Sequence, residues 1–219
     1  GNGNTEAIQA LVEAGADVNA RDQDGNTPLH IATRNGNIEA IQALVEADAD
    51  VNANGRSYKT PLHIAAENDN AEAIQVLIQA EAYVNARDQF GNTALHIATK
   101  SFQARYGYTQ IIQALIANPH VDVNAQDNNG LTPLHIAAVN GDAEAIQVLI
   151  QAEAYVNLQD ENGKTALDLA RAQKEINLTR RNYNKIIEIL ENAEASQASN
   201  NIDNDQPLDI DREETNTNI

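Results

Sequence analysis

Apolar residues along the chain fall into short groups with helical spacing, and the groups come in pairs. One group covers residues 29–32 and its partner covers residues 41–45, with Gly36 between them. Positions three and four apart lie on the same face of an α-helix, so each group predicts one buried helical face. A polar stretch follows each pair. The pattern therefore predicts a helix–turn–helix unit that ends in an exposed loop.

This unit recurs along the chain with an almost fixed period. The phrase Thr-Pro-Leu-His, or a close variant of it, begins at Thr27, Thr60, Thr93, Thr132 and Thr165, so the spacings are 33, 33, 39 and 33 residues. An Asp-Val-Asn or Tyr-Val-Asn phrase recurs in phase with it. Self-similarity at such a period indicates a solenoid, in which stacked neighbours bury a core that no single unit buries alone.

With its 33-residue period, the Thr-Pro-Leu-His phrase resembles the ankyrin repeat family. The resemblance implies an all-α solenoid of stacked helix–turn–helix units with projecting β-hairpin-like loops. It covers residues 1–192, which we divide into a partial repeat at 1–21, repeats at 22–54, 55–87, 88–126 and 127–159, and a capping repeat at 160–192. Repeat 88–126 holds 6 extra residues, and we place most of them around 101–108.

The two ends of the array differ from its middle. Residues 1–19 contain only a second helix and its exit, so Ile8 and Leu11 should lack part of their cover. We therefore expect further repeats upstream of Gly1. Residues 193–219 are rich in Asn, Asp, Glu and Ser, which predicts an acidic, disordered tail.

Several residues other than glycine occupy positions where a left-handed backbone is expected. The residue that follows the second helix is Gly15 in the first unit, but Asp48, Glu81 and Glu153 in later units. Tyr58 stands where the other loops carry a glycine. We expect a positive φ at the three exit positions, Asp48, Glu81 and Glu153, at a cost of roughly 1 kcal/mol each.

The composition excludes several classes of function. The chain has 219 residues with 32 acids and 14 bases, a formal net charge of −18. Such a surface argues against binding to nucleic acid or to an anionic membrane. The absence of cysteine excludes disulfides, Cys-type zinc sites and cysteine nucleophiles, and it fits a reducing compartment. We expect a cytoplasmic location, with secretion into a host cell as the alternative.

One histidine per repeat is the main candidate for chemistry. His30, His63, His96 and His135 would lie about 10 Å apart in stacked layers, which is too wide for a shared metal ion. We interpret them as structural residues that bond loop backbone. The sequence contains no phosphate-binding loop, dinucleotide fingerprint or nucleophile elbow. We therefore expect no catalysis, no cofactor and no metal.

Two asparagines are candidates for modification. Asn19 and Asn52 each end a Leu-x5-Asp-Val-Asn phrase, which resembles the acceptor motif of asparaginyl hydroxylases that act on ankyrin repeats. The alternative is structural, with the asparagine amide bonding the loop backbone. Both interpretations stay open at this point.

The resemblance implies a module that binds other proteins through its loop tips and the concave face of its first helices. Carried over by position, the candidate partner-binding residues are Tyr58, Lys59, Phe90, Asn92, Lys100, Phe102, Tyr106, Leu131, Val139 and Asn140. Exposed aromatic residues are typical of binding hot spots, although Phe102 fits equally well a role in packing the insertion.

The acidic composition favours a protein partner of basic or mixed charge. We expect a monomer that inserts into no membrane. The alternative function is a regulatory or targeting domain of a larger multidomain protein, either an enzyme or a secreted bacterial effector.

Overall fold

The computed structural model describes residues 2–100, 108–176 and 183–204. These residues form eleven α-helices and one 3-10 turn, and they contain no strand. The elements are α1 (Asn2–Glu13), α2 (Pro28–Arg34), α3 (Ile38–Glu46), η1 (Arg56–Tyr58), α4 (Pro61–Glu67), α5 (Ala71–Gln79), α6 (Ala94–Lys100), α7 (Tyr108–Ile116), α8 (Pro133–Asn140), α9 (Ala143–Gln151), α10 (Ala166–Ile176) and α11 (Tyr183–Asn204).

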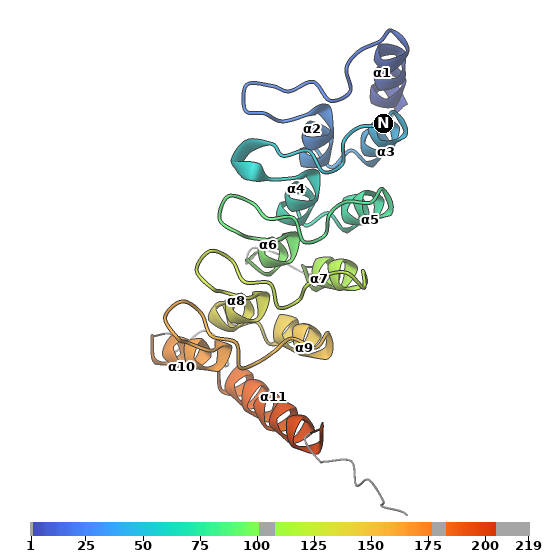
Figure 1. The fold of residues 1–219 in the computed structure, drawn as a ribbon. Coiled ribbons are helices and arrows are strands. Elements are labelled where there is room, and N and C mark those ends of the chain that lie inside the picture. The colour runs from blue at the N-terminus through green and yellow to red at the C-terminus, as the bar shows by residue number, and fades with distance from the viewer. Residues whose placement is uncertain (1, 101–107, 177–182, 205–219) are drawn as a thin grey trace, which may run out of the picture.

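The helices stack in two parallel layers, as Figure 1 shows. The even-numbered helices α2 to α10 form an inner layer, and the odd-numbered helices form an outer layer beside it. Long loops project from the inner layer on the side away from the outer helices. The arrangement confirms the predicted all-α solenoid of helix–turn–helix units.

Each complete inner helix begins at the recurring threonine. Thr60 is extended, with φ −85° and ψ 168°, and Pro61 takes the first helical position. A proline is favourable there because its missing N–H would have no partner within the helix. Leu62, Ala65 and Ala66 are buried and let neighbouring inner helices approach closely.

The outer helices are fixed by a short polar cap and a buried apolar face. Asn70 accepts a hydrogen bond from the N–H of Ala73 at 2.9 Å, and Asp142 accepts the equivalent bond from Ala145 at 3.0 Å. Side-chain caps of this kind stabilise a helix by about 1 kcal/mol. In α5 the side chain of Leu77 is fully buried, as the helical spacing predicted.

The expected left-handed residues are confirmed. Asp48, Glu81 and Glu153 have φ values of 60°, 64° and 64°. The structure adds Tyr58, with φ 59°, and Asp69, with φ 52°. Other repeats carry a glycine at both positions, so the same signal in the sequence could have predicted them.

The long repeat distributes its 6 extra residues over two places. Ile112 follows Thr93 by 19 residues, whereas Ile74 follows Thr60 by 14, so five extra residues precede Ile112. Residues 101–107 lie outside the described part of the chain. The sixth extra residue lies in the exit loop, where Val121 donates to the carbonyl of Asn118 at 3.1 Å.

The N-terminal unit lacks cover, as predicted. The side chain of Leu11 is 60% exposed, whereas its equivalent Leu77 in a complete repeat is 0% exposed. The difference arises because no inner helix packs beside α1 in the way that α4 packs beside α5. The stabilising surface of each unit is therefore supplied by its neighbours.

The predicted start of the tail at residue 193 was wrong. Helix α11 continues to Asn204, and the side chain of Ala193 within this helix is buried. Gln197 holds this part of the helix in place, because its amide donates to the carbonyl of Ala154 at 2.8 Å and accepts from the N–H of Val156 at 3.2 Å. Residues 193–204 contain few apolar residues, so the sequence provided no indication of these contacts. Residues 205–219 lie outside the described residues.

Candidate functional site

The four repeated histidines connect each unit to the loop of the next. His30, His63, His96 and His135 lie at 0–1% exposure beneath the loops. The Nε2 atom of His63 lies 3.0 Å from the carbonyl oxygen of Asn92, and His96 makes the same contact with Leu131 at 3.0 Å. The predicted structural role of these histidines is confirmed. We call the four histidines and their loop carbonyls the histidine ladder.

The hydrogen bonds also fix the protonation state of the ladder. In each repeat Nδ1 accepts a hydrogen bond from the backbone N–H of the capping threonine, as in the 3.1 Å contact from Thr60 to His63. The ring proton therefore resides on Nε2, which donates it to the next loop. Burial lowers the pKa of all four rings, so they are neutral in the folded protein.

An aspartate shapes most of the loop tips. In repeat 88–126, Asp88 Oδ1 accepts from the N–H groups of Phe90 and Asn92, both at 2.9 Å. Asp127 accepts the equivalent bonds in the next repeat. Hydrogen bonds from Asn26 similarly lower the pKa of Asp22 in the first loop. These turns hold the tip residues in a fixed conformation before any partner arrives.

The second loop has a different tip because it lacks this aspartate. Gly55 occupies the position of Asp88, and residues 56–58 form the 3-10 turn η1 instead. Ser57 and Tyr58 both take positive φ values in this turn, 61° and 59°. The consequence is that the ring of Tyr58 stands 64% exposed at the tip.

Backbone hydrogen bonds join successive tips into one continuous surface. Gln89 donates to the carbonyl of Ser57 at 2.9 Å, Asn128 donates to Phe90 at 3.0 Å, and Glu161 donates to Asn129 at 3.1 Å. The tips of four loops are thus fixed relative to one another. We call these tips, together with the exposed sides of the inner helices, the inner surface.

The predicted apolar contacts lie on this surface. Phe90 is 57% exposed, on a tip hydrogen-bonded to the tip that carries Tyr58. Leu131 and Val139 are half-buried in the following repeat. They occupy the positions that Asn92 and Lys100 hold one repeat earlier. The structure therefore places two exposed aromatic residues, Tyr58 and Phe90, on neighbouring tips. Two half-buried apolar residues, Leu131 and Val139, lie in the next repeat, the second of them in α8.

The two predicted lysines are held by acids of the inner surface. Lys59 Nζ lies 2.6 Å from Glu67 Oε1 within its own repeat. Lys100 Nζ lies 3.7 Å from Asp127 Oδ2 of the next repeat. Both side chains are partly exposed, so these pairs contribute little to stability. Their charges are fixed in place for a partner.

One predicted contact residue requires correction. Asn92 is only 5% exposed, because its side-chain amide donates to Asp88 and its backbone carbonyl accepts from His63. It belongs to the fold and not to the accessible surface. Asn140 is half-buried, as Leu131 and Val139 are, and donates to the carbonyl of Thr99 at 2.9 Å in the preceding repeat, so its role as a contact stays a prediction. Phe102 and Tyr106 lie outside the described residues.

Charge is divided unevenly between the two layers. The inner segments 20–36, 54–69, 87–100, 126–141 and 159–176 hold ten acids and nine bases. The five outer helices α1, α3, α5, α7 and α9, with their exit loops, hold no Lys or Arg, and their thirteen acids are Glu6, Glu13, Asp17, Glu39, Glu46, Asp48, Asp50, Glu72, Glu81, Asp122, Asp142, Glu144 and Glu153. The inner surface is therefore nearly neutral, which the net charge alone did not reveal.

The candidate asparagines hold the exit loops together. Asn19 Oδ1 accepts from the N–H of Asp50 at 2.8 Å, and Asn52 Oδ1 accepts from Tyr83 at 2.7 Å. These bonds support the structural interpretation of both residues. Hydroxylation of Asn19 and Asn52 stays a prediction.

The described residues offer little for other kinds of chemistry. They contain no group of three or more His, Cys, Asp or Glu side chains that could hold a metal ion. None of the helices within these residues has the length and hydropathy needed to cross a membrane.

Comparison with known families agrees with the repeat geometry. Three sequence models of the ankyrin-repeat family match: one for ankyrin repeats in many copies at residues 2–45, another for many copies at 44–98, and one for three copies at 101–201. No curated protein matches the chain. Ankyrin repeats are generally protein–protein interaction modules. The matches together span residues 2–201, and the chain belongs to the ankyrin-repeat family.

Proposed function

We propose that the chain binds a partner protein through the inner surface, with Phe90, Tyr58 and Leu131 as its central contacts. One observation carries this proposal: the two aromatic rings are 57% and 64% exposed on tips whose backbones are already fixed by hydrogen bonds. A rigid surface loses little conformational entropy on binding. Large exposed aromatic side chains supply most of the binding energy in such surfaces.

The charge of the inner surface defines the partner further. Lys59 and Lys100 lie beside Glu67 and Asp127, so both signs are present within a short distance. A partner of mixed charge fits this arrangement better than a strongly basic one. A monomeric state and a cytoplasmic location complete the proposal, since the cysteine-free sequence fits a reducing compartment.

A photo-crosslinking experiment tests the proposal. A photoreactive amino acid replaces Phe90 in one sample and Gln75, an exposed residue of the outer helix α5, in the other. The proposal predicts a specific protein adduct from position 90 and none from position 75. Adducts of equal yield from both positions would contradict it.

Affinity measurements then separate binding from folding. The double variant Phe90→Ala and Leu131→Ala should weaken binding of the captured partner at least tenfold, while its thermal midpoint stays within a few degrees. The control is Gln75→Ala, which should change neither. A large fall in the midpoint would show that the two side chains serve the fold instead.

A further inference from the structure

Two tyrosines outside the inner surface are held by their backbone N–H groups but leave their side chains largely exposed. Tyr83 and Tyr155 are 70% and 60% exposed in the loops that leave α5 and α9. They lie in identical 15-residue segments, Ala71–Asn85 and Ala143–Asn157. The two segments belong to repeats that are separated by one further repeat.

Comparison with the other repeats shows what these tyrosines replace. Asp50 holds the position of Tyr83, and its Oδ1 accepts from the N–H of Asn52 at 2.9 Å. Asp122 accepts the same bond from Asn124 at 3.0 Å. A tyrosine ring has no oxygen placed to accept this bond, so Tyr83 and Tyr155 give up a stabilising contact to expose an aromatic ring.

Each tyrosine also lines a cavity, and the two cavities share three equivalent positions. A cavity of about 630 Å³ is lined by Ile78, Glu81 and Tyr83, together with His120 of the next repeat. A second, of about 760 Å³, is lined by the equivalent Ile150, Glu153 and Tyr155, together with residues of α11.

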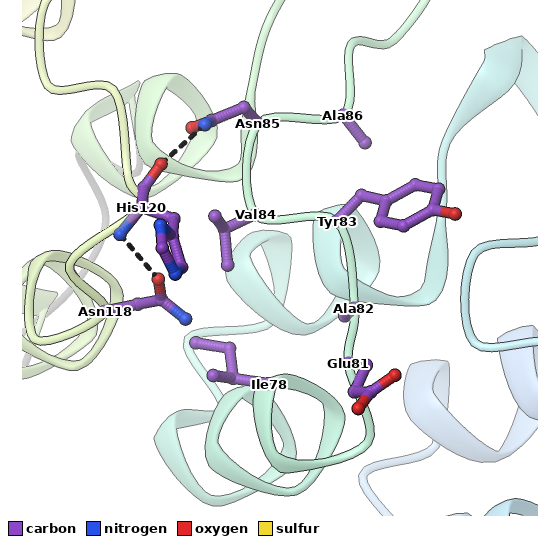
Figure 2. Close-up of a pocket in the computed structure, with 9 residues that line it drawn as sticks. All are labelled: Ile78, Glu81, Ala82, Tyr83, Val84, Asn85, Ala86, Asn118 and His120. Carbon is purple, nitrogen blue, oxygen red and sulfur yellow. Dashed lines mark hydrogen bonds between the residues drawn. The ribbon is translucent and has the colours of Figure 1, made fainter.

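Figure 2 shows how the first cavity is built. The side chains of Ile78 and Val84 point toward Asn118 and His120. The ring of Tyr83 and the carboxylate of Glu81 both point to the opposite side of the loop. The loop therefore offers an apolar recess on one side and an aromatic ring with a carboxylate on the other.

The charge around Tyr83 and Tyr155 indicates which kind of chemical group binds there. Helices α1, α3, α5, α7 and α9 and their exit loops contain no Lys or Arg, whereas α11 carries Lys185. The acids Asp48, Asp50 and Asp122 continue the same row of exit loops. An aromatic face with nearby carboxylates attracts an ammonium or guanidinium group through cation–π and ionic contacts. The methylene stem of such a side chain can pack along the tyrosine ring.

We propose that the row of exit loops, which we call the exit strip, binds a basic peptide segment of a protein. One Arg or Lys side chain lies against Tyr83 and Glu81, and a second lies against Tyr155 and Glu153. This surface is separate from the inner surface and binds independently of it.

The repeat spacing sets the spacing of the two cations. Helices packed side by side lie about 8–10 Å apart, so two repeats separate the tyrosines by about 16–20 Å. An extended peptide advances about 3.3 Å per residue. The two basic residues should therefore lie about five or six positions apart in the segment.

The probe is the peptide Arg-Ser-Gly-Ser-Gly-Ser-Arg, titrated into the full chain and followed by amide NMR. The expected shifts cluster at residues 81–85 and 153–157. A matched peptide with one arginine replaced by glutamine should bind at least threefold more weakly. Shifts concentrated at residues 56–59 and 88–92, or equal affinity for both peptides, would overturn the proposal.

The variants Tyr83→Asp and Tyr155→Asp separate the proposal from simple charge attraction. Each restores the aspartate of the other repeats, so folding should be unchanged or stabilised. Loss of the ring should weaken peptide binding about two- to fivefold per variant, although each variant adds a negative charge. Tighter or unchanged binding would show that net charge alone holds the peptide. Phe90→Ala is the control and should leave peptide binding unchanged.

Discussion

Phe90 and His96 lie six residues apart in one repeat, yet the fold uses them in opposite ways. His96 is completely buried, and its Nε2 atom bonds the next loop at 3.0 Å. Phe90 is 57% exposed, although its backbone is held by Asp88 and by the following loop. The histidine ladder thus fixes the backbone of the inner surface and leaves the tip side chains available for a partner.

One repeat therefore contains two classes of residue: ladder residues that support the fold and tip residues whose side chains remain exposed. Ladder residues must match the neighbouring repeat, so the same residue types recur at every ladder position except in the last unit. There Asp168 replaces histidine and, among the described residues, accepts hydrogen bonds from its own Thr165. Tip side chains have no such requirement and differ from loop to loop. The ladder should therefore control stability, and the tips should control binding.

The largest expected effect is a loss of stability in mild acid. Burial lowers the pKa of all four ladder histidines below the ordinary value of 6.5. As the pH falls from 6.5 toward the lowered pKa of the folded protein, these histidines become protonated in the unfolded chain but stay neutral in the folded protein. The free energy of unfolding should then decrease by up to about 1.4 kcal/mol per pH unit for each histidine.

Urea denaturation between pH 7.5 and 5 measures this slope. The carboxylates of Asp22 and Asp160 have a pKa below the ordinary value of 3.8, so their titration lies below this pH range. A free energy of unfolding that stays constant from pH 7.5 to 5 would contradict the neutral ladder.

The second effect compares the two residue classes directly. His96→Ala should destabilise the protein by about 2–4 kcal/mol, because it leaves the buried Thr93 N–H without its acceptor, removes one of the two hydrogen bonds to the Leu131 carbonyl and empties the site of a buried ring. Phe90→Ala should change stability by less than about 0.5 kcal/mol. Similar losses in urea denaturation for both variants would remove the distinction between ladder and tip.

A smaller effect concerns the strained exit positions. Glu81→Gly and Glu153→Gly should each stabilise the protein by about 0.5–1 kcal/mol, since both residues have φ 64°. Gln75→Gly, within α5, is the matched control and should destabilise by about 1 kcal/mol. If the two glutamate variants also lose stability in urea denaturation, the side chains make contacts that outweigh the strain.

The sequence was sufficient to predict the parts of the structure that repeat. The Thr-Pro-Leu-His phrase predicted the inner helices, the buried histidines and the loop contacts, because the same local hydrogen bonds recur in each unit. Substitution of glycine likewise predicted the positive φ at Glu81 and Glu153. Both follow from local backbone chemistry, which a sequence displays directly.

What depends on contacts between distant residues could not be predicted. The role of Gln197 depends on Ala154 and Val156, more than forty residues away. Asn92 was taken for an exposed contact because its position in the loop gave no sign that Asp88 and Lys100 enclose its side chain. The near-neutral charge of the inner surface depends on which helices share a layer, and the net charge of the chain gives no indication of it.

The central claim is that the tip side chains bind a partner while the ladder only supports them. Once a partner has been captured by crosslinking, amide NMR of the complex tests this claim most directly. We predict that the largest shifts occur at residues 56–59, 88–91 and 127–131, with little change in α3, α5 and α9. Shifts confined to those outer helices, with the tips unchanged, would contradict the claim.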